Sequence, residues 1–483
     1  MEKKFKDKKV LLLGLGVLGG GIAMAKWLFK QGAKLKISDL KNKKELKQSL
    51  LKLKDIKAQY ILGKHRYQDI DWANQIVVNP AVSYQNNYVQ YALKRNKIID
   101  NDCSLFFTYA QGDIIAVTGT RGKTTTTTWI YQLLTKVLDK QKKIFLGGNQ
   151  PEKGLLKILP HTTNNSLSII ELSSFQLEFY RLGLRSPKIA IITSIFNDHL
   201  NRYKSMVDYV TTKMKIFQNQ KENDYLILNY DNEWTNFILK GKPKSQIFFV
   251  SLNKLQKEFN GVYYFKDHIF IKDNFKTLDI GDFKKFKNNF GEHNLTNFLF
   301  AILSCYLYLK LTNQKFDLNI KKYAYQLIVP KYRQEKIYQN KHLMIINDSA
   351  STSPDAVISA IKRFSQLTKN LILITGGTDK NLDFKNLALL IKKFIRPSDI
   401  ILLDGTATKK LIKELENVKY HLNSNQICQN LKECLMNGLN ISKKFKKSII
   451  LFSPGAASFE KFKNEFDRGK KFDLLVKNVL KFN

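Results

Sequence analysis

A glycine-rich turn at residues 117–125 is the feature that most constrains how this chain can fold. An apolar run leads into V-T-G-T-R-G-K-T-T, in which Gly119 and Gly122 precede Lys123 and Thr124. When a strand passes through such a turn into a helix, consecutive backbone N–H groups point at one place, where a phosphate fits. Lys123 can reach the outer phosphate oxygens, and Thr124 can place its hydroxyl on Mg²⁺. The turn therefore predicts a strand–turn–helix unit that binds a nucleoside triphosphate.

The spacing of this turn leaves one alternative open. It reads G-T-R-G-K-T, whereas the general P-loop pattern is G-x-x-x-x-G-K-[ST], so the pattern is not strictly matched. The competing interpretation is a glycine-rich turn between strand and helix that binds no ligand.

Length and cysteine content limit the class of protein. A chain of 483 residues is too long for one core and predicts two to four domains. With 43% hydrophobic residues it can bury sizeable cores, so it is not a disordered chain. The cysteines at 103, 305, 428 and 434 have neither metal-ligand nor disulfide-framework spacing, which predicts reduced thiols in a cytoplasmic protein and no zinc site.

The formal net charge of +39 must be interpreted before nucleic acid is considered as a partner. The excess is overwhelmingly lysine and runs from Lys3 to Lys481 without one dense block. Asn, Ile, Phe and Tyr are also plentiful, a pattern typical of A/T-rich coding bias. We therefore expect the charge to favour anionic substrates and do not expect nucleic-acid binding as the main function.

The N-terminal region allows two interpretations. Its basic residues followed by an apolar stretch resemble a secretory signal. However, Gly14, Gly16 and Gly19 directly follow a short apolar run, a helical pattern comes next, and a second strand ends at Asp39, as in a Rossmann-like nucleotide-binding turn. We favour the Rossmann-like turn. Since no uninterrupted apolar run has the roughly 18 residues of a membrane span, no membrane insertion is expected.

Short strands alternate with helical patterns along the whole chain, which predicts an α/β protein of three domains with mainly parallel sheets. The expected domains are a Rossmann-like domain at 1–110, a central P-loop ATP-binding domain at 111–329 and a C-terminal Rossmann-like domain at 330–483. A Lys/Phe/Asn-rich linker is expected at 283–290. The expected strands cover 10–13, 34–38, 75–78, 97–99, 167–170, 189–193, 225–229, 342–346, 370–374, 399–403 and 448–451.

Candidate catalytic residues follow two strands of the central segment. Glu171 opens E-L-S-S-F-Q-L-E, and Asp198 and His199 lie in N-D-H-L-N-R-Y. The carboxyl ends of parallel strands face the crevice in which α/β proteins bind ligands. The sequence therefore predicts that these groups join Thr124 around Mg²⁺.

At this point the chain resembles a known family, the Mur ligases, ATP-dependent amide-forming enzymes of peptidoglycan synthesis. The resemblance runs almost end to end, and within the family it favours the branch that joins D-glutamate to UDP-N-acetylmuramoyl-L-alanine through an acyl phosphate. The motifs that carry it are T-G-T-R-G-K-T-T, E-L-S-S-F-Q-L-E, D-H-L-N-R-Y, G-E-H-N-L-T-N, N-D-S-A-S-T-S, G-G-T-D-K-N-L-D-F and S-P-G-A-A-S-F-E-K-F-K-N-E-F-D-R-G.

The resemblance implies a role for individual residues. Lys123, Glu171, His199 and Lys213 would be catalytic; Thr124, Glu171, His199 and a carbamylated Lys213 would bind two Mg²⁺. ATP would contact Gly119, Thr120, Arg121, Gly122, Lys123, Thr124, Thr125, Asn294, Asn297, Arg333 and Asp348. The UDP substrate would contact Gly14, Gly16, Val17, Leu18, Gly19, Asp39, Asn79 and Asn149. The incoming glutamate would contact Thr352, Lys380 and Ser458.

The chain departs from the usual family pattern at three places, and other functions stay open beside this one. Asn79-Pro-Ala stands where Ser-Pro-Gly is frequent, Ala350 replaces a lysine, and Glu465 lies near an aromatic position. The open alternatives are a related ligase that adds L-Glu or L-Ala or acts on folate, a nucleic-acid-stimulated P-loop ATPase, and a non-catalytic scaffold. The expected state is a monomer with small-molecule substrates.

Overall fold

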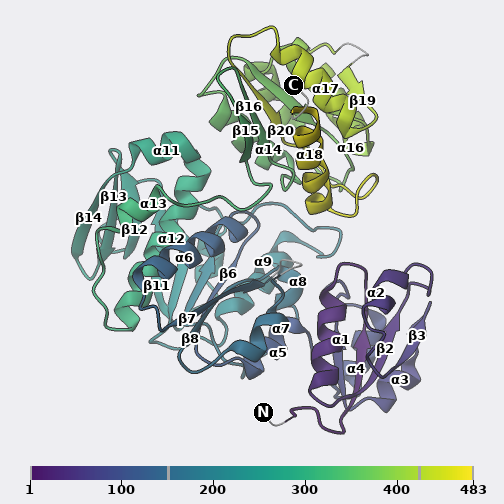
Figure 1. Ribbon diagram of the computed structural model, residues 1–483. Helices are drawn as coiled ribbons and strands as arrows, with labels where there is room; N and C mark the ends of the chain where they lie inside the picture. The colour runs from purple at the N-terminus through teal and green to yellow at the C-terminus, as the bar shows by residue number, and fades with distance from the viewer. Residues whose placement is uncertain (1–2, 149–152, 423–425, 481–483) are drawn as a thin grey trace. The chain divides into compact units, whose positions relative to one another are not determined.

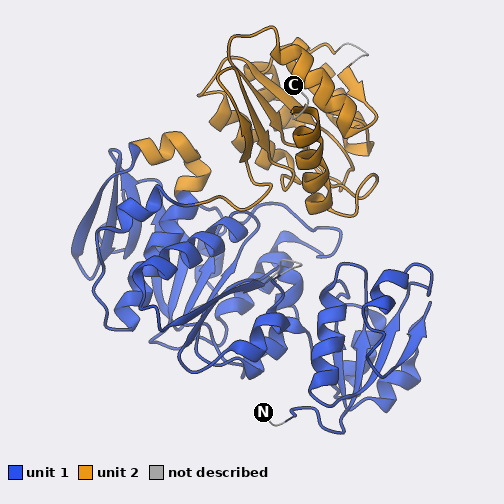
Figure 2. Ribbon diagram, in the orientation of Figure 1, with its two compact units in different colours: residues 1–284, 296–327 blue, residues 285–295, 328–483 orange. Residues whose placement is uncertain are grey.

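The computed structural model describes residues 3–148, 153–422 and 426–480 (Figure 1). It divides into two compact units, Met1–Lys284 with Thr296–Leu327 and Lys285–Leu295 with Ile328–Asn483 (Figure 2). Three sheets are present, and most of their strand pairs are parallel, which confirms the predicted α/β class. The domain boundaries expected from the sequence stay predictions.

The first sheet, drawn in purple in Figure 1, is wholly parallel and has the order β3-β2-β1-β4-β5. Its strands are β1 (Lys9–Leu13), β2 (Lys34–Asp39), β3 (Ala58–Leu62), β4 (Gln75–Val78) and β5 (Ile98–Asp100). Its helices are α1 (Gly20–Lys30), α2 (Lys47–Leu51), α3 (Tyr67–Trp72), α4 (Asn87–Lys94) and α5 (Asp102–Tyr109). The chain leaves β1 toward β2 on one side and returns to β4 on the other, so the glycine turn after β1 lies at a topological switch point. The sequence analysis missed β3, an edge strand with only one buried residue.

The second sheet has nine strands in the order β14-β13-β12-β11-β10-β9-β6-β8-β7. The strands are β6 (Asp113–Thr118), β7 (Lys143–Gly148), β8 (Ser166–Glu171), β9 (Ile189–Ile192), β10 (Tyr225–Asn229), β11 (Gln246–Ser251), β12 (Gly261–Phe265), β13 (His268–Asp273) and β14 (Lys276–Asp282). The helices are α6 (Lys123–Val137), α7 (Leu155–Ile158), α8 (Ser174–Leu177), α9 (Met206–Met214), α10 (Thr235–Leu239), α12 (Glu292–Leu311) and α13 (Ile320–Ala324). Because β6 lies between β8 and β9, the segments that follow these three strands emerge side by side.

One edge of this mainly parallel sheet is antiparallel and is formed by strands that the sequence analysis did not predict. Strands β12, β13 and β14 pair antiparallel. The connections are only two residues long, and all four of their residues, Lys266, Asp267, Asn274 and Phe275, have positive φ. Two consecutive residues with positive φ form the tight turn that suits a β-hairpin, and so short a connection has no room for a crossover helix.

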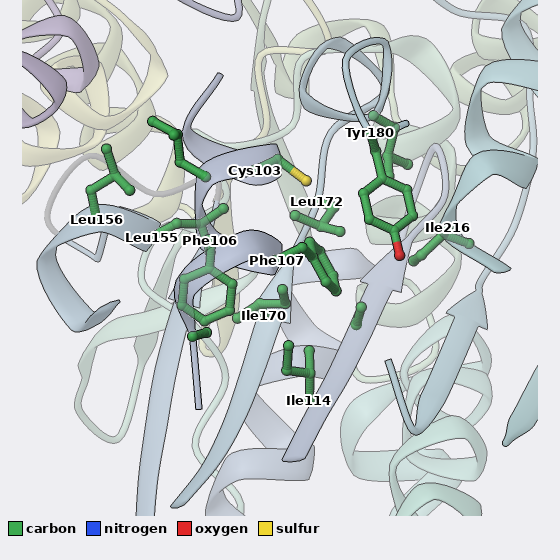
Figure 3. Close-up of a cluster of buried hydrophobic side chains, with 14 of the residues drawn as sticks. Cys103, Phe106, Phe107, Ile114, Leu155, Leu156, Ile170, Leu172, Tyr180 and Ile216 are labelled. Carbon is green, nitrogen blue, oxygen red and sulfur yellow. The ribbon is translucent and has the colours of Figure 1, made fainter. Parts of the chain in front are cut away.

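The core of the first unit continues from α5 into the central sheet. Figure 3 shows the rings of Phe106, Phe107 and Tyr180 among aliphatic side chains from β6, β8 and α7. The rings of Phe107 and Tyr180 lie 4.7 Å apart. Burying such aromatic side chains removes a large apolar area from water, so this cluster holds α5 against the sheet.

Helix α12 is the one helix among the described residues that is long and apolar enough to cross a membrane, with a mean hydropathy of 1.2. However, 78% of its apolar window is buried inside the structure. Protein side chains, rather than lipid, therefore cover most of its surface.

The third sheet belongs to the second unit and has the order β15-β16-β20-β17-β18-β19. Its strands are β15 (Glu335–Gln339), β16 (Leu343–Asn347), β17 (Leu371–Thr375), β18 (Ile400–Leu403), β19 (Ile427–Cys428) and β20 (Ser448–Phe452). Its helices are α14 (Pro354–Phe364), α15 (Lys385–Phe394), α16 (Thr406–Asn417), α17 (Leu431–Ser442) and α18 (Glu465–Leu480). One hydrophobic cluster packs α14–α16 and another packs α17 and α18, so helices cover both faces of the sheet.

Two features of this unit were not predicted from the sequence. Strand β15 runs antiparallel to β16, because a hairpin through Asn340 joins them instead of a helical crossover. The segment expected to be a linker forms the helix α11 (Lys284–Phe290), in which Phe286 is buried.

Candidate functional site

The glycine turn after β6 is pressed closely against its neighbours. Gly119 has φ 142°, and a Cβ placed there would lie 2.0 Å from Thr193 Oγ1. Gly122 has φ 83°, and its Cβ would lie 2.4 Å from Asn297 Oδ1. Only glycine fits at both positions, and the backbone can then turn directly into α6, whose first residue is Lys123.

Arg121 in this turn has buried N–H groups for which the described residues provide no acceptor. Its Nη1 lies 3.4 Å from Asp198 Oδ2, whereas Nε and Nη2 are buried and have no hydrogen-bond acceptor among the described residues. A buried donor without an acceptor is costly, so this guanidinium fits a site that an anionic ligand completes. The backbone of the neighbouring Thr120 is fixed by a hydrogen bond, in which its N–H donates to Ser194 O at 2.7 Å.

Glu171 is the last residue of β8 and pairs in register with Val117 of β6, just before the turn. The residue is buried, and its Oε2 has no hydrogen-bond partner among the described residues. Burying a carboxylate oxygen without a hydrogen-bond donor is costly, and a bound cation would offset this cost. The structure therefore places Glu171 beside the phosphate turn, and its chemistry fits Mg²⁺, while its predicted contact with the ion stays a prediction.

Lys213, in the last turn of α9, is also buried in this region. Its Nζ donates to Gly119 O at 2.9 Å and lies 4.5 Å from the centre of the Tyr209 ring. Burial and the charge of Lys123 lower the pKa of Lys213 well below the ordinary lysine value, although the carboxylates of Asp198 and Glu171 act in the opposite sense. Burial thus penalises the charged form of this amine.

His199 lies on the segment after β9, where its backbone has φ 57°. Its Nε2 is 3.9 Å from Asp198 Oδ2, and its ring lies 4.9 Å from that of Phe175 and 6.0 Å from that of Tyr209. The fold thus brings the His199 segment to the same edge as the glycine turn. The described residues contain no cluster of three His, Cys, Asp or Glu side chains able to hold a metal. Any ion here would need other ligands, such as the Thr124 hydroxyl, phosphate oxygens or a modified lysine.

Asn297 of α12 lies beside the phosphate turn, with its Oδ1 accepting from Thr126 Oγ1 at 3.4 Å. Asn294, one helical turn earlier, is buried and donates to Phe290 O at 3.0 Å. The structure therefore places Asn297 next to the predicted ATP site. The predicted contact of Asn294 with ATP is not tested.

The glycine turn of the first sheet has a conformation suited to an anion. Gly14, Gly16 and Gly19 all have positive φ, and α1 begins at the next residue. Asp39 Oδ2 accepts from the N–H groups of Leu15 and Gly16, each at 2.8 Å. The carboxylate thus holds the turn in shape, a role that the sequence analysis did not assign to it.

The remaining residues predicted to bind the UDP substrate are distributed around this turn. Asn79 follows β4, and its side chain lies 3.0 Å from the position that a Cβ on Gly14 would take. Val17 and Leu18 are 55% and 59% exposed, so their side chains are available at the surface of the turn. Asn149 lies outside the described residues.

In the second unit, the residues predicted to bind the amino acid follow three adjacent parallel strands. Thr352 comes after β16, Ser458 after β20 and Lys380 after β17. The last two segments are joined by an isolated bridge between Thr378 and Ala457. A cavity of about 10 Å³ lies beside this bridge and is lined in part by Ser458, whose buried Oγ has no hydrogen-bond partner among the described residues.

Asp348, also after β16, is buried and accepts from Ser453 Oγ at 2.7 Å and from Gln334 N at 3.0 Å. Burial raises its pKa to about 7, although these hydrogen bonds and the charges of Arg333 and Arg363 act in the opposite direction. Asp348 and Arg333 thus lie within electrostatic reach of each other. Their predicted contacts with ATP are not tested.

The sequence analysis missed Arg468, on α18, which is completely buried. Its guanidinium donates to Ser349 Oγ and O at 3.1 and 2.8 Å and to the carbonyls of Ala456 and Ala457, each at 3.1 Å. It therefore holds together the segments after β16 and β20. The sequence signal that could have identified Arg468 is an arginine among the apolar positions of a helical pattern.

Comparisons with known proteins agree with this architecture. The sequence model described as "Mur ligase middle domain" matches residues 117–305, and that described as "Mur ligase MurD-like, N-terminal domain" matches residues 8–100. UDP-N-acetylmuramoylalanine–D-glutamate ligase from Borreliella afzelii (strain PKo) is 35% identical over 482 residues, which cover 98% of each chain. The protein of the same name from Clostridioides difficile (strain 630) is 32% identical over 98% of this chain and 99% of its own length.

Solved structures share the fold at low sequence identity. The MurF ligase from Thermotoga maritima in complex with ADP has a TM-score of 0.56 and 14% identity, with 99% of this chain and 97% of that chain covered. Folylpolyglutamate synthase from Mycobacterium tuberculosis has a TM-score of 0.54 and 10% identity, with 75% of this chain and 91% of that chain covered. At such identities the likeness supports the fold alone.

Proposed function

The chain belongs to the Mur ligase family, and we propose that it joins D-glutamate to UDP-N-acetylmuramoyl-L-alanine with the consumption of ATP. The observation that carries this proposal is the buried carboxylate oxygen of Glu171, which has no partner among the described residues and lies beside a phosphate turn that only glycine can form. A cation and an anionic ligand would satisfy the groups that this edge of the sheet leaves without partners. Relatives that match over nearly the whole chain are named for the same reaction.

Mg²⁺ fits the donors at this edge. Thr124, Glu171, His199 and a carbamylated Lys213 would hold two ions together with phosphate oxygens. When bound, Mg²⁺ would neutralise charge that develops on the phosphates during transfer. We assign the carbamate to Lys213 because burial favours the neutral amine that reacts with CO₂, and because an anionic oxygen donor suits Mg²⁺ better than an ammonium group does.

The residues of the phosphate turn would act by position and charge. A carboxylate is a poor electrophile at neutral pH, so it must first accept the γ-phosphoryl group of ATP to become an acyl phosphate, which the amine of glutamate then attacks. Lys123 and Arg121 would bind phosphate oxygens through this transfer, and the N–H groups of 119–124 would cradle them. Asn297 of α12, which contacts Thr126 in the first turn of α6, would help to orient the nucleotide.

Substrate recognition would use the other two strand-end clusters. In the first sheet, the turn at 14–19 and Asn79 would bind the UDP portion, with Asp39 keeping the turn in shape. In the third sheet, Lys380 would pair with the side-chain carboxylate of glutamate, and Thr352 and Ser458 would donate to its oxygens. The buried hydroxyl of Ser458, which has no hydrogen-bond partner in the described part of the chain, suits an oxyanion. We further propose a monomer that acts in the cytoplasm.

One assay tests the proposed function. Purified protein is given ATP, Mg²⁺ and UDP-N-acetylmuramoyl-L-alanine, with D-Glu, L-Glu, D-Asp and L-Ala in parallel, and phosphate release and the ligated product are measured. We expect both signals with D-Glu. Turnover with L-Glu or L-Ala alone, or only when a folate replaces the UDP substrate, would identify a different member of the ligase family. No turnover with any acceptor would indicate a scaffold.

A further inference from the structure

Glu178 and Arg202 form a largely buried ion pair near the segment of His199. Arg202 Nε donates to Glu178 Oε1 and Arg202 Nη2 to Glu178 Oε2, both at 2.7 Å, so two parallel bonds join the planar groups. The Arg202 side chain is only 10% exposed and the Glu178 side chain only 6%. Pairs with this geometry are the stronger and more directional ones, and burial shields them from solvent screening.

The pair binds the segment that follows β4. Arg202 Nη1 donates to Ala81 O and Nη2 to Val82 O, each at 3.1 Å, and Glu178 Oε2 accepts from Tyr84 N at 2.8 Å. All three contacts are with backbone atoms, so they determine the path of the chain. This segment begins at Asn79, next to the glycine turn that we assign to the UDP portion of the substrate.

The pair also joins the His199 segment, to which Arg202 itself belongs through a backbone turn in which its N–H donates to His199 O at 2.9 Å. Tyr203, the next residue of this segment, donates its hydroxyl to Glu178 Oε1 at 2.8 Å. The Arg202 guanidinium lies 3.8 Å from the centre of the Phe175 ring, and this ring in turn lies 4.9 Å from the His199 ring and 6.4 Å from the Tyr203 ring. One ion pair therefore orients a segment from each of two substrate-binding sheets.

We propose that Glu178 and Arg202 are positioning residues that hold residues 79–84 against the His199 segment, so that the bound UDP substrate presents its carboxylate to the phosphate of ATP. The inference rests on the proposed function. Neither side chain needs to touch a substrate, because the effect acts through the backbone of residues 81–84.

A purely structural role for the pair would predict that other contacts between the same parts of the chain matter equally for substrate binding. Other polar contacts join the same two parts of the chain, among them the ion pair between Arg181 and Asp100 and the hydrogen bond from Asn101 Nδ2 to Gln176 O at 2.8 Å. If the Glu178–Arg202 pair only held these parts together, loss of the Arg181 pair should have a similar effect. If the pair positions the substrate segment, only its own loss should weaken binding of the UDP substrate.

The experiment compares Arg202→Lys and Glu178→Gln with the matched control Arg181→Lys. Lysine keeps the buried charge but loses the fork that reaches Ala81 and Val82. Calorimetry with UDP-N-acetylmuramoyl-L-alanine in the absence of ATP, together with steady-state kinetics, gives the readouts. We expect a rise of about tenfold or more in Kd and KM for the UDP substrate in both variants, a change in free energy of roughly 1.4 kcal/mol. The KM for ATP should stay within about twofold, and Arg181→Lys should resemble wild type.

Equal changes in both KM values, or the same loss in Arg181→Lys, would overturn the positioning role. If Glu178→Gln fails to fold, a double-mutant cycle of Arg202→Lys with Asn79→Ala decides the question. If Arg202 acts through residues 79–84, the two substitutions should have non-additive effects on the Kd for the UDP substrate. Additive effects would count against the proposal. A wild-type enzyme that does not turn over the UDP substrate would instead refute the proposed function.

Discussion

At the scale of single residues, Lys213 shows how burial in the fold changes the pKa of a side chain. In the sequence it is one of many lysines, but the fold places its amine inside the protein at 2.9 Å from Gly119 O. Burial makes the charged form costly, and this lowers the pKa of the amine. The neutral form can then react with CO₂.

Replacement of Lys213 tests the proposed carbamate. Lys213→Ala should lower turnover by at least about 10²-fold, because an anionic ligand near the transferred phosphoryl group is lost. Added acetate should restore part of the activity, and wild type depleted of CO₂ should recover when bicarbonate is supplied. The control is Lys136→Ala, an exposed lysine in the last turn of α6, which should retain full activity. Wild-type activity in Lys213→Ala would exclude the carbamate.

Lys380 tests the amino-acid site. A glutamate carboxylate loses hydration when it binds, so a cation must offset the cost. Lys380→Ala should therefore raise the KM for D-Glu by roughly 10²-fold and leave the KM for ATP nearly unchanged, with partial recovery in Lys380→Arg. Lys385→Ala, an exposed lysine at the start of α15, serves as the control. Equal increases for every substrate would point to misfolding rather than lost recognition.

Asp348 should make stability depend on pH. Its folded-state pKa is raised to about 7, above the ordinary aspartate value, so the folded state holds a proton that the unfolded state has released. This contribution to stability is complete below the unfolded-state pKa and is lost as the pH rises through about 7. Asp348→Asn, which mimics the protonated form, should therefore gain Tm relative to wild type between pH 5 and pH 8. Asp355→Asn, on the exposed side of α14, should show no such gain. A pH-independent difference for Asp348→Asn would contradict the shift.

At the scale of elements, the order of strands decides which side chains meet. Strand β6 has β8 on one side and β9 on the other, so the turn after β6 lies between Glu171 and the segment of His199. The close contact of Gly119 with Thr193 is a consequence of this order. The turn therefore depends on glycine for two separate reasons, its backbone conformation and the lack of space.

These two reasons can be separated by comparing Gly119→Ala with Gly183→Ala. Both glycines have positive φ, but a Cβ on Gly183 would meet nothing within 4 Å, whereas one on Gly119 would lie 2.0 Å from Thr193 Oγ1. Gly183→Ala should cost only the backbone strain of about 1–2 kcal/mol. Gly119→Ala should destabilise the protein more and should weaken ATP binding by at least about tenfold. Chemical denaturation and ATP titration measure the two effects, and equal losses would show that crowding at Thr193 is unimportant.

At the scale of the whole molecule, the chain has 80 lysine and arginine residues but only 41 acidic ones. This imbalance raises the question whether the protein binds nucleic acid. Electrostatic binding to nucleic acid would weaken steeply with salt. We expect duplex DNA or single-stranded RNA to change ATP turnover by less than about twofold between 50 and 150 mM salt, because the charge is spread along the chain rather than gathered in one run. The assay is phosphate release with and without nucleic acid. Strong, salt-sensitive stimulation would favour the P-loop ATPase alternative.

The sequence by itself determined the features that depend on neighbouring residues. Glycines that turn a strand into a helix, and the apolar runs of buried strands, are local patterns, and they correctly located β1, β4, β6 and β10. The resemblance to a family supplied the order of the motifs and the function. Local patterns were not enough at β12–β14, where the direction of pairing depends on two-residue turns, or at β3, whose partly exposed residues lack a clear alternation.

Only the tertiary structure decided the environments of the side chains. Nothing near Glu178 in the sequence indicates that its carboxylate meets Arg202, and nothing near Arg468 indicates that its guanidinium binds the carbonyls of Ala456 and Ala457. The lowered pKa of Lys213 and the unpartnered oxygen of Glu171 arise in the same way. The physical reason is that desolvation and hydrogen bonding depend on atoms contributed by distant segments, which come together only when the sheets form.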